Sequence, residues 1–332
     1  MGAKDIVTKD YVKDVQVFAD AFNYLLFEGE PVIDPSKLHE MDTTEIGMPY
    51  GEGKARAPVQ KFRDSLSYLT AMEDGNAAYL LLGIEAQSGV HHAMAVRNMV
   101  YDALQYASQV EKAARSHRDA AKKDGEHDAG TVSRGKADVR VGADEYLSGF
   151  HKGDRLLPVI TLVLLFSPEP WDAPMSIHEM LSVKNPKLLA FVPDYRINLI
   201  APAQIEAEDM DRFKSSLREV LLYIRYSKDE EKLQELLATD PHFRALDRRA
   251  AVVINTVTNS KLVFDEKEGT VDMCQAIAEM REKERREGRQ EGSQEEKKEI
   301  ASRMLRAGRL SIEEIAEYVG LSIAIVKGLA VR

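Results

Sequence analysis

The sequence predicts an α/β protein, with a mixed sheet flanked by helices and a helical C-terminal extension. Short continuous apolar runs at residues 79–84 and 156–166 have the length and composition of strands buried on both faces of a sheet. Apolar residues at helical spacing mark the segments 11–27 and 91–110, which lie before and between those runs. After Ile205 the helical pattern continues almost to the end of the chain. This order of elements indicates a mixed α/β core with a helical C-terminal part.

The composition is that of a soluble globular protein. The chain has 332 residues, of which 44% are hydrophobic and 30% charged, enough to bury a substantial core. No apolar run approaches the roughly 20 residues of a membrane span. Residues 1–10 lack the apolar segment of a secretory signal, and the single cysteine, Cys274, excludes an internal disulfide and a cysteine-based zinc site. We therefore expect a cytoplasmic protein with no membrane partner.

The net charge of −10 narrows the possible partners. It argues against a protein that coats nucleic acid non-specifically, because neutralising phosphates requires Lys and Arg. It does not argue against a nuclease, since a metal site needs local carboxylates and a basic patch can occupy one face of an acidic protein.

The first half of the chain alternates helix, loop and strand signals. Gly29 and Pro31 end the helix predicted over 11–27, and the glycines and prolines of residues 43–58 predict a loop. A stretch with period two, 62–69, reads as a strand, and the sequence Asp74-Gly75-Asn76 predicts a turn before the apolar run 79–84. We therefore expect the two strands to be adjacent and antiparallel.

The second half begins with a charged segment. The stretch after the helix 91–110 contains almost no large apolar side chain, which predicts the charged end of that helix followed by a flexible insertion around 112–142. The run 156–166 is the best candidate for a buried strand, and 195–200 predicts another. We place the core at 1–205, a helical region at 206–290 and a C-terminal helical hairpin at 291–332. The charged stretch 281–296 is interpreted as a solvated helix or a linker.

The C-terminal hairpin resembles a small helix-turn-helix. Ser311 and Glu314 form a capping-box pattern, Gly320 ends the first helix, and Ser322 can cap a second. The second helix offers Lys327 but no Arg, Asn or Gln for base edges. Packing or self-association, giving a homo-oligomer, therefore competes with DNA reading as its role.

Two carboxylates and an amide could form a site on the predicted sheet. Asp64 lies on one predicted strand, and Glu85 follows the next one directly. Gln87 comes two residues after Glu85, which places both on the same face of a strand. Carboxylate oxygens with water and a substrate phosphate suit Mg²⁺ or Mn²⁺. Alternatively, Asp64 pairs with a nearby cation and Glu85 merely ends a strand, although a carboxylate after five apolar strand residues is expected to need a partner or a metal.

Several segments, in order, resemble a known family. Asp64 followed by Ile84-Glu85-Ala86-Gln87 is similar to the D…(E)xK pattern of the PD-(D/E)XK nuclease superfamily, with Gln in place of Lys. The surrounding segments, over roughly residues 10–200, resemble the bacterial recombination-promoting nuclease and putative transposase family: Phe18-Ala19-Asp20-Ala21-Phe22-Asn23, Arg63-Asp64, Gly83-Ile84-Glu85-Ala86-Gln87-Ser88, Met94-Ala95-Val96-Arg97-Asn98-Met99-Val100-Tyr101-Asp102 and Leu157-Pro158-Val159-Ile160-Thr161.

The resemblance implies a restriction-endonuclease-like core and a metal-dependent DNA endonuclease linked to recombination or transposition. Asp64 and Glu85 would hold Mg²⁺ or Mn²⁺, and Gln87 would occupy the place of the usual lysine. Gln offers no positive charge to the phosphate, but it can orient the attacking water by hydrogen bonds. The competing interpretations are a nuclease fold that has lost catalysis and binds DNA or a protein partner, and a helical interaction protein in which the carboxylates are incidental.

Two helical pairs are candidates for supporting roles. Asp20 and Asn23 lie three apart on one face of the first helix, either as an additional metal contact or as a polar pair that fixes the helix against the sheet. Arg97 and Tyr101 lie four apart on the second helix, either contacting DNA phosphate or stacked on each other at the surface.

Other residues that attract attention have ordinary interpretations. His91 and His92 are adjacent, so they are poor joint metal ligands, and we expect cap or surface roles. Trp171, among prolines, is expected to anchor its loop, and Cys274 to be a buried structural thiol.

Overall fold

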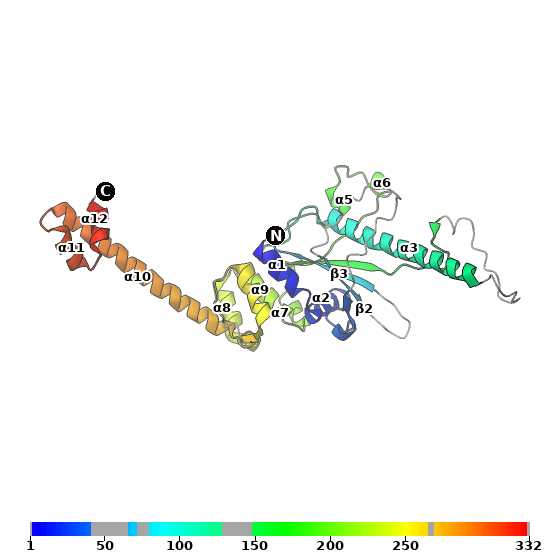
Figure 1. Ribbon diagram of the computed structural model, residues 1–332, viewed down its shortest axis with the longest axis horizontal. Coiled ribbons are helices and arrows are strands. Elements are labelled where there is room, and N and C mark those ends of the chain that lie inside the picture. The colour runs from blue at the N-terminus through cyan, green and yellow to red at the C-terminus, as the bar shows by residue number, and fades with distance from the viewer. Residues whose placement is uncertain (1, 41–65, 72–79, 128–147, 265–268, 331–332) are drawn as a thin grey trace. The chain divides into compact units, whose positions relative to one another are not determined.

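The computed structural model describes residues 2–40, 66–71, 80–127, 148–264 and 269–330 (Figure 1). The chain forms two compact units. The first, here called the core unit, comprises residues 1–242 and 246–260, and the second, the C-terminal unit, comprises residues 243–245 and 261–332. None of the described helices combines the length and the apolar character that crossing a membrane requires.

The core unit is a mixed α/β structure, as predicted. Its sheet has the order β1-β2-β3-β4-β5, in which β1, β2 and β3 are antiparallel neighbours and β3, β4 and β5 are parallel neighbours. Its elements in chain order are α1 (Ala3–Tyr11), α2 (Val15–Phe27), η1 (Pro35–Lys37), β1 (His39–Glu40), β2 (Leu66–Ala71), β3 (Leu80–Gln87), α3 (Met94–His127), β4 (Val159–Leu165), α5 (Ile177–Met180), α6 (Pro186–Leu189), β5 (Asn198–Ile200), η4 (Pro202–Gln204), η5 (Glu208–Arg212), α7 (Leu217–Tyr226), α8 (Glu230–Thr239), β6 (Leu246–Asp247) and α9 (Arg248–Thr258).

The two central strands are buried on both faces. In the parallel pair β3–β4, Gly83 lies beside Thr161 and Glu85 beside Val163, so these side chains share one face of the sheet. Helix α3, which connects the two strands, covers this face, because Asp102 on α3 accepts a hydrogen bond from Thr161. The opposite face packs against the N-terminal helices, and α1 contacts β3 (Figure 1). The register therefore places Glu85 and Gln87 toward α3.

Helix α2 begins later than the predicted helix. Asp14 caps it by accepting hydrogen bonds from the backbone of Gln16 and Val17, so the chain before Val15 belongs to a separate helix, α1. The helix ends at Phe27, and Gly29 follows with φ +89°. A Cβ at Gly29 would lie 2.6 Å from the carbonyl oxygen of Arg212, so glycine lets these two backbones approach closely.

The charged segment after residue 110 is helical for its first part. Helix α3 continues to His127, so the predicted charged end of the helix is confirmed, but the flexible insertion does not begin near residue 112 as predicted. The Arg115 Nη2 atom lies 2.5 Å from a carboxylate oxygen of Glu111. The His117 ring stacks on the His151 ring, and its Nε2 atom forms a hydrogen bond with Asp154. A pair within the helix and contacts from the segment after residue 150 thus stabilise a charged helix that has little apolar surface. Residues 128–142, the rest of the predicted insertion, lie outside the described residues.

Helices α7, α8 and α9 belong to the core unit, whereas the rest of the predicted helical region 206–290 includes the start of α10, which belongs to the C-terminal unit. Helix α9 packs on α1, and α7 packs on both α2 and α9. The Phe213 ring stacks on Tyr24 with a centroid distance of 4.2 Å, and Arg249 forms an ion pair with Asp14. The boundary predicted at residue 205 therefore differs from the division in the structure, because apolar faces far apart in sequence are buried against each other.

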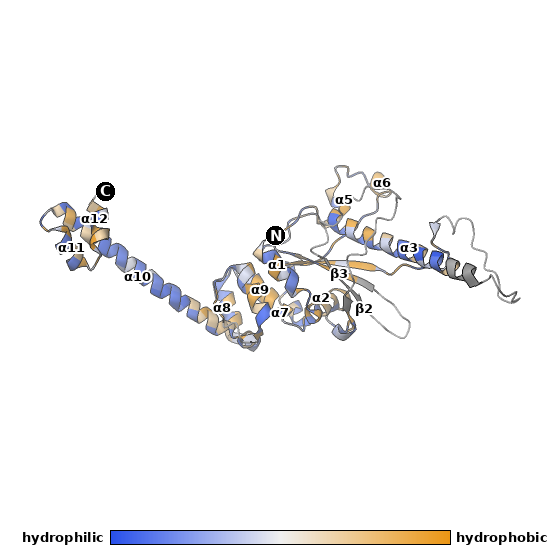
Figure 2. Ribbon diagram, in the orientation of Figure 1, coloured by the Kyte–Doolittle hydropathy of each residue, from blue (hydrophilic) through white to orange (hydrophobic). Residues whose placement is uncertain are grey.

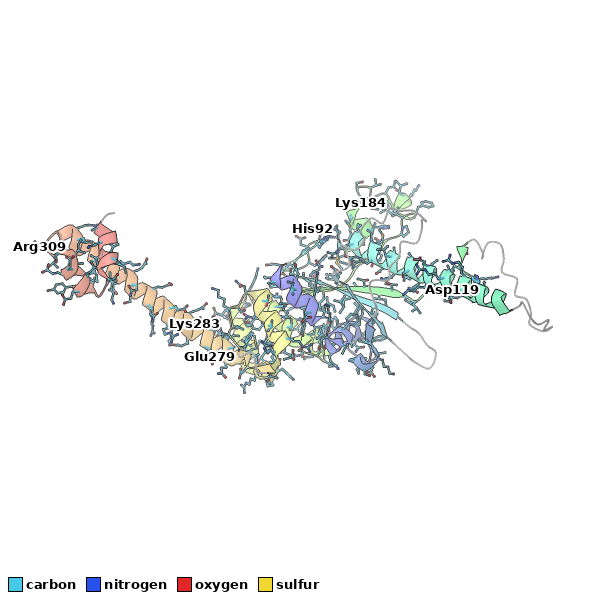
Figure 3. The ribbon with its side chains drawn as sticks, viewed as in Figure 1. His92, Asp119, Lys184, Glu279, Lys283 and Arg309 are labelled. Carbon is cyan, nitrogen blue, oxygen red and sulfur yellow. The ribbon has the colours of Figure 1, made fainter. Side chains whose placement is uncertain are left out.

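The C-terminal unit contains β7 (Thr270–Val271), α10 (Met273–Ala307), α11 (Ile312–Val319) and α12 (Ile323–Ala330). The stretch 281–296, interpreted as a solvated helix or a linker, is helical within α10. Hydrophilic residues dominate the middle of α10 (Figure 2), and exposed side chains such as Lys283 project from it (Figure 3). The predicted capping box of Ser311 and Glu314 is confirmed. A small apolar core joins the end of α10 to α11 and α12: Ala301, Ile315, Ala316, Val319, Leu321 and Val326.

Candidate functional site

Glu85 is the centre of the candidate site. It lies near the end of β3, and its side chain is fully buried. Gln87 donates a hydrogen bond from Nε2 to the Glu85 Oε1 atom at 2.8 Å. Arg97 on α3 also lies 2.8 Å from that oxygen, through its Nη2 atom. The structure thus brings Glu85 and Gln87 together, as their spacing predicts, and adds a cation from the helix above them.

Arg97 is held in place from a second side. Its Nε atom donates to the Tyr101 hydroxyl at 2.9 Å, and its guanidinium carbon lies 5.6 Å from the centre of the Tyr101 ring. Tyr101 is buried, whereas the Arg97 side chain keeps 25% of its surface exposed. Arg97 and Tyr101 therefore do stack on each other, but Tyr101 is buried and Arg97 is also bound to Glu85. The pair positions a partly exposed cation over a buried carboxylate, at the edge where β3 and β4 end.

The second predicted carboxylate, Asp64, lies outside the described residues. Leu66, two residues later in the chain, begins β2 and pairs directly with Glu85. The predicted antiparallel pairing of these two strands is confirmed.

A second polar group lies beside the site on α3. Asp102 is buried and accepts hydrogen bonds from Thr161 Oγ1 and from the Tyr195 hydroxyl, each at 2.6 Å. Burial raises the pKa of Asp102, and the two hydrogen bonds oppose that rise. These bonds tie α3 to β4 and to the chain just before β5. Sequence reasoning missed this role of Asp102, although the residue closes the family-like segment that begins at Met94.

Asp20 and Asn23 make structural contacts. Asp20 accepts hydrogen bonds from the backbone nitrogens of Lys214 and Ser215 and from the Ser215 hydroxyl. Asn23 exchanges two hydrogen bonds with the backbone of Ile33, at 3.1 and 2.7 Å. Of the two predicted roles, these contacts match the fixing of helix α2. The fixed partners are the loops before η1 and α7 rather than the sheet.

His91 and Trp171 have the roles predicted for them, whereas Cys274 is not the fully buried thiol that the sequence predicts. His91 accepts a hydrogen bond at Nδ1 from the Ala93 backbone, which is a cap role before α3. Trp171 is buried in an apolar cluster with Met94 and Ile197, so it anchors its loop. Cys274 is half-buried, and burial raises the pKa of its thiol.

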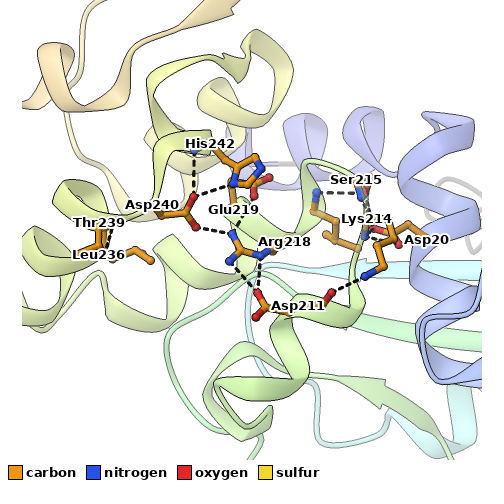
Figure 4. Close-up of polar contacts among 11 residues, drawn as sticks. Asp20, Asp211, Lys214, Ser215, Arg218, Glu219, Leu236, Thr239, Asp240 and His242 are labelled. Atoms are coloured by element: carbon orange, nitrogen blue, oxygen red, sulfur yellow. Dashed lines mark hydrogen bonds and ion pairs between the residues drawn. The ribbon is translucent and has the colours of Figure 1, made fainter.

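Apart from the site around Glu85, the core unit has a cluster of acidic residues at the start of α7 and after α8 (Figure 4). Ligand atoms of Glu219, Asp240 and His242 lie within 4.8 Å of one another, and among the described residues this is the group able to hold a metal ion. Arg218 already lies within it, 2.5 Å from Asp240 and 3.1 Å from Glu219, and bonds to Asp211 at 2.8 Å. The positive charge that balances these carboxylates is therefore the guanidinium of Arg218.

The pKa values of Glu219 and Asp240 are shifted in opposite directions. Burial raises the pKa of Glu219, and the hydrogen bond from Arg218 only partly offsets it. Burial also acts on Asp240, but bonds from Arg218 and from the His242 backbone outweigh it, so the pKa of Asp240 is lowered. The sequence carried one weak signal of this cluster, the Asp-Pro-His spacing after α8.

No protein-family model matches the chain, and comparison with curated proteins and with solved structures gives no match either.

Proposed function

We propose that the chain is a divalent-metal-dependent DNA endonuclease with a PD-(D/E)XK-like core, linked to DNA recombination or transposition. The observation that carries the proposal is the fully buried Glu85 at the end of a central strand, with Gln87 and Arg97 on one of its oxygens. A buried carboxylate is costly unless a cation or donors compensate it. Such an arrangement at the edge of a sheet is characteristic of functional sites.

The donor set fits a hard divalent cation. The carboxylates of Glu85 and Asp64 are oxygen ligands of the kind that Mg²⁺ and Mn²⁺ prefer. A cation bound to Glu85 would compete with Arg97 for the Oε1 atom. Because Arg97 is partly exposed and has a long side chain, its guanidinium can turn from Glu85 to a phosphate in front of the site.

A divalent ion held by Glu85 and Asp64 would supply Lewis-acid polarisation of the phosphate and activation of a water. Arg97 would bind a phosphate oxygen and contribute the positive charge that Gln87 lacks. Tyr101 positions Arg97 through the hydrogen bond to Nε. Gln87 orients the attacking water, since its amide can both donate and accept hydrogen bonds.

The test is plasmid cleavage with Mg²⁺ or Mn²⁺ by the wild type, Asp64→Ala and Glu85→Ala. Glu208→Ala is the matched control, because Glu208 is an exposed carboxylate of η5 away from the site. We expect metal-dependent nicking by the wild type and the control, and a loss of about 1,000-fold in the other two. Equal cleavage by all four proteins would sink the assignment.

A catalytically inactive nuclease fold that binds DNA or a protein is the second candidate. It is favoured by one observation, that two groups of the chain itself already engage the Glu85 Oε1 atom. In the same experiment this candidate predicts no cleavage by wild type, with a gel shift of the plasmid that Glu85→Ala retains. Cleavage that depends on Glu85 would exclude it.

Self-association through the C-terminal helices accompanies either candidate. Tyr318, Ile323 and Ile325 expose apolar surface on α11 and α12, beside the small core of the C-terminal unit. Exposed apolar groups of this kind are frequent at protein interfaces. A light-scattering mass of a single chain at micromolar concentration would contradict this role.

A further inference from the structure

The segment 175–197, between β4 and β5, forms a loop whose two ends lie side by side. Its two ends pair: the backbone nitrogen of Ile177 donates to Tyr195 and that of Ile197 donates to Met175, both at 3.0 Å. The loop carries the one-turn helices α5 and α6. Compact loops whose ends meet in this way are frequently functional. Residues 183–192 are here called the tip.

Internal hydrogen bonds hold the tip in one shape. The His178 backbone nitrogen donates to Asp194 at 2.9 Å, and the His178 Nε2 atom lies 2.7 Å from the Val192 carbonyl oxygen. Lys184 donates to the His178 carbonyl at 2.9 Å, and Asn185 caps α6. The tip is therefore an ordered structure, and its exposed groups are presented at fixed positions.

The tip exposes large apolar side chains to solvent. Phe191 is 88% exposed and Leu188 56% exposed, and Val183 and Val192 are also exposed. An ordered loop that leaves a phenylalanine in water gains nothing from it in the folded chain, so the side chain indicates a partner. Residues 181–193 also contain two lysines and no acidic residue, in a protein whose net charge is −10. The combination of apolar groups and positive charge favours a polyanion that has apolar surfaces.

The base of the loop packs on the part of the core that carries the candidate site. Ile177, Met180 and Tyr195 contact the cluster that contains Met94 and Ala95, in the first turn of α3. Arg97 follows in the next positions of the same helix. Figure 3 shows Lys184 and His92 at this end of α3. The base of the loop is therefore adjacent to the helix that carries Arg97.

We infer that the tip is a DNA wedge, in which Phe191, supported by Leu188, inserts between base pairs of a duplex bound at the candidate site while Lys187 contacts phosphate. Apolar wedges flanked by basic groups unstack and kink duplex DNA in this way. A tip of four apolar side chains is small compared with the roughly 800 Å² per partner of a stable protein interface, which argues against a second copy as occupant. The inference rests on the proposed function for its DNA substrate.

The test is binding of a fluorescent duplex containing 2-aminopurine, in the absence of divalent metal, by the full-length chain. We expect the wild type to raise 2-aminopurine fluorescence, because the base is unstacked. Phe191→Ser should abolish that rise and weaken binding about ten-fold, as loss of a base–aromatic contact does. Lys187→Ala should keep the rise and reduce the salt dependence by about one phosphate contact. Val263→Ser is the control: it removes an apolar side chain that is 73% exposed but lies outside the loop, and it should behave as wild type.

Two outcomes would overturn the inference. Equal affinity and fluorescence for wild type and Phe191→Ser exclude the wedge. A wild-type dimer that Phe191→Ser converts to a monomer, with unchanged DNA affinity, identifies a second copy as the occupant. Failure of the nuclease proposal is separate: duplex binding and unstacking that depend on Phe191, with no metal-dependent cleavage, would leave the wedge in place and remove the endonuclease.

Discussion

Among the arginines of the core unit that bind carboxylates, Arg218 and Arg97 are both largely buried, but they differ in how many acidic groups surround the guanidinium. Arg218 contacts three carboxylates, Asp211, Glu219 and Asp240, which come from the segments before, within and after helices α7 and α8. Arg97 contacts the carboxylate of Glu85 and the hydroxyl of Tyr101. Both cations are partly buried, but their surroundings suit opposite purposes.

The difference teaches how to separate a structural ion pair from a candidate site. Arg218 holds three carboxylates from different chain segments together. If Arg218 turned away to bind another ligand, these carboxylates would repel one another, so such an exchange is unfavourable. Arg97 lies at the end of a parallel strand pair, where ligands commonly bind α/β sheets. In the proposed nuclease, a metal ion would take the place of Arg97 on Glu85, and Arg97 would bind a phosphate instead. The comparison is therefore between a fixed bridge and an exchangeable one.

The largest effect on stability is expected at the fixed bridge. Arg218→Ala leaves Glu219 and Asp240 close together with no guanidinium, which should lower the free energy of unfolding by about 3 kcal/mol. Urea unfolding measures this. Arg212→Ala is the control, because the exposed pair of Arg212 with Asp209 should contribute less than about 1 kcal/mol. Equal losses in the two variants would remove the distinction between the bridges.

An intermediate effect is expected at the exchangeable bridge. Arg97→Met removes a cation that competes with and repels a divalent ion, so Mn²⁺ should bind about ten-fold more tightly, by calorimetry. Arg97→Lys keeps the positive charge and should bind Mn²⁺ nearly as wild type does. If Glu85→Gln abolishes Mn²⁺ binding while Arg97→Met leaves it unchanged, Glu85 is a ligand but Arg97 does not compete for it.

The smallest effect concerns the protonation of Glu219. Burial raises its folded-state pKa above the ordinary value of 4.5, so its protonated form favours the folded state. That contribution is fully present below about pH 4.5 and is lost as the pH rises through the folded-state pKa. Glu219→Gln should therefore gain stability relative to wild type between pH 4 and pH 7, by about 1 kcal/mol or less. Urea unfolding at both pH values measures the gain, and a relative loss would mean that Arg218 outweighs burial.

Much of the core could be predicted from short-range patterns. The apolar runs around Ile84 and Leu162 are strands, and the two-residue spacing of Glu85 and Gln87 places them on one face. Ser311 caps its helix as its sequence motif indicates. These features depend on the backbone periodicity of strands and helices, which a sequence displays directly.

Other features could not be predicted, because they join distant parts of the chain. Asp20 bonds to residues near 214, and Asp102 bonds to Tyr195. The helix from Met94 extends through the charged segment to His127 because local ion pairs support it, although its composition suggested flexibility. Composition reports the average polarity of a segment and not the pairs that its side chains form.

The sequence by itself determined the α/β class, the strand that carries Glu85 and the shared face of Glu85 and Gln87. The tertiary structure alone decided that Arg97 lies over that carboxylate, that Arg218 bridges three acids, and that Phe191 projects from an ordered tip. The physical reason is that periodicity follows from covalent geometry, whereas contacts and exposure follow from which surfaces are buried together.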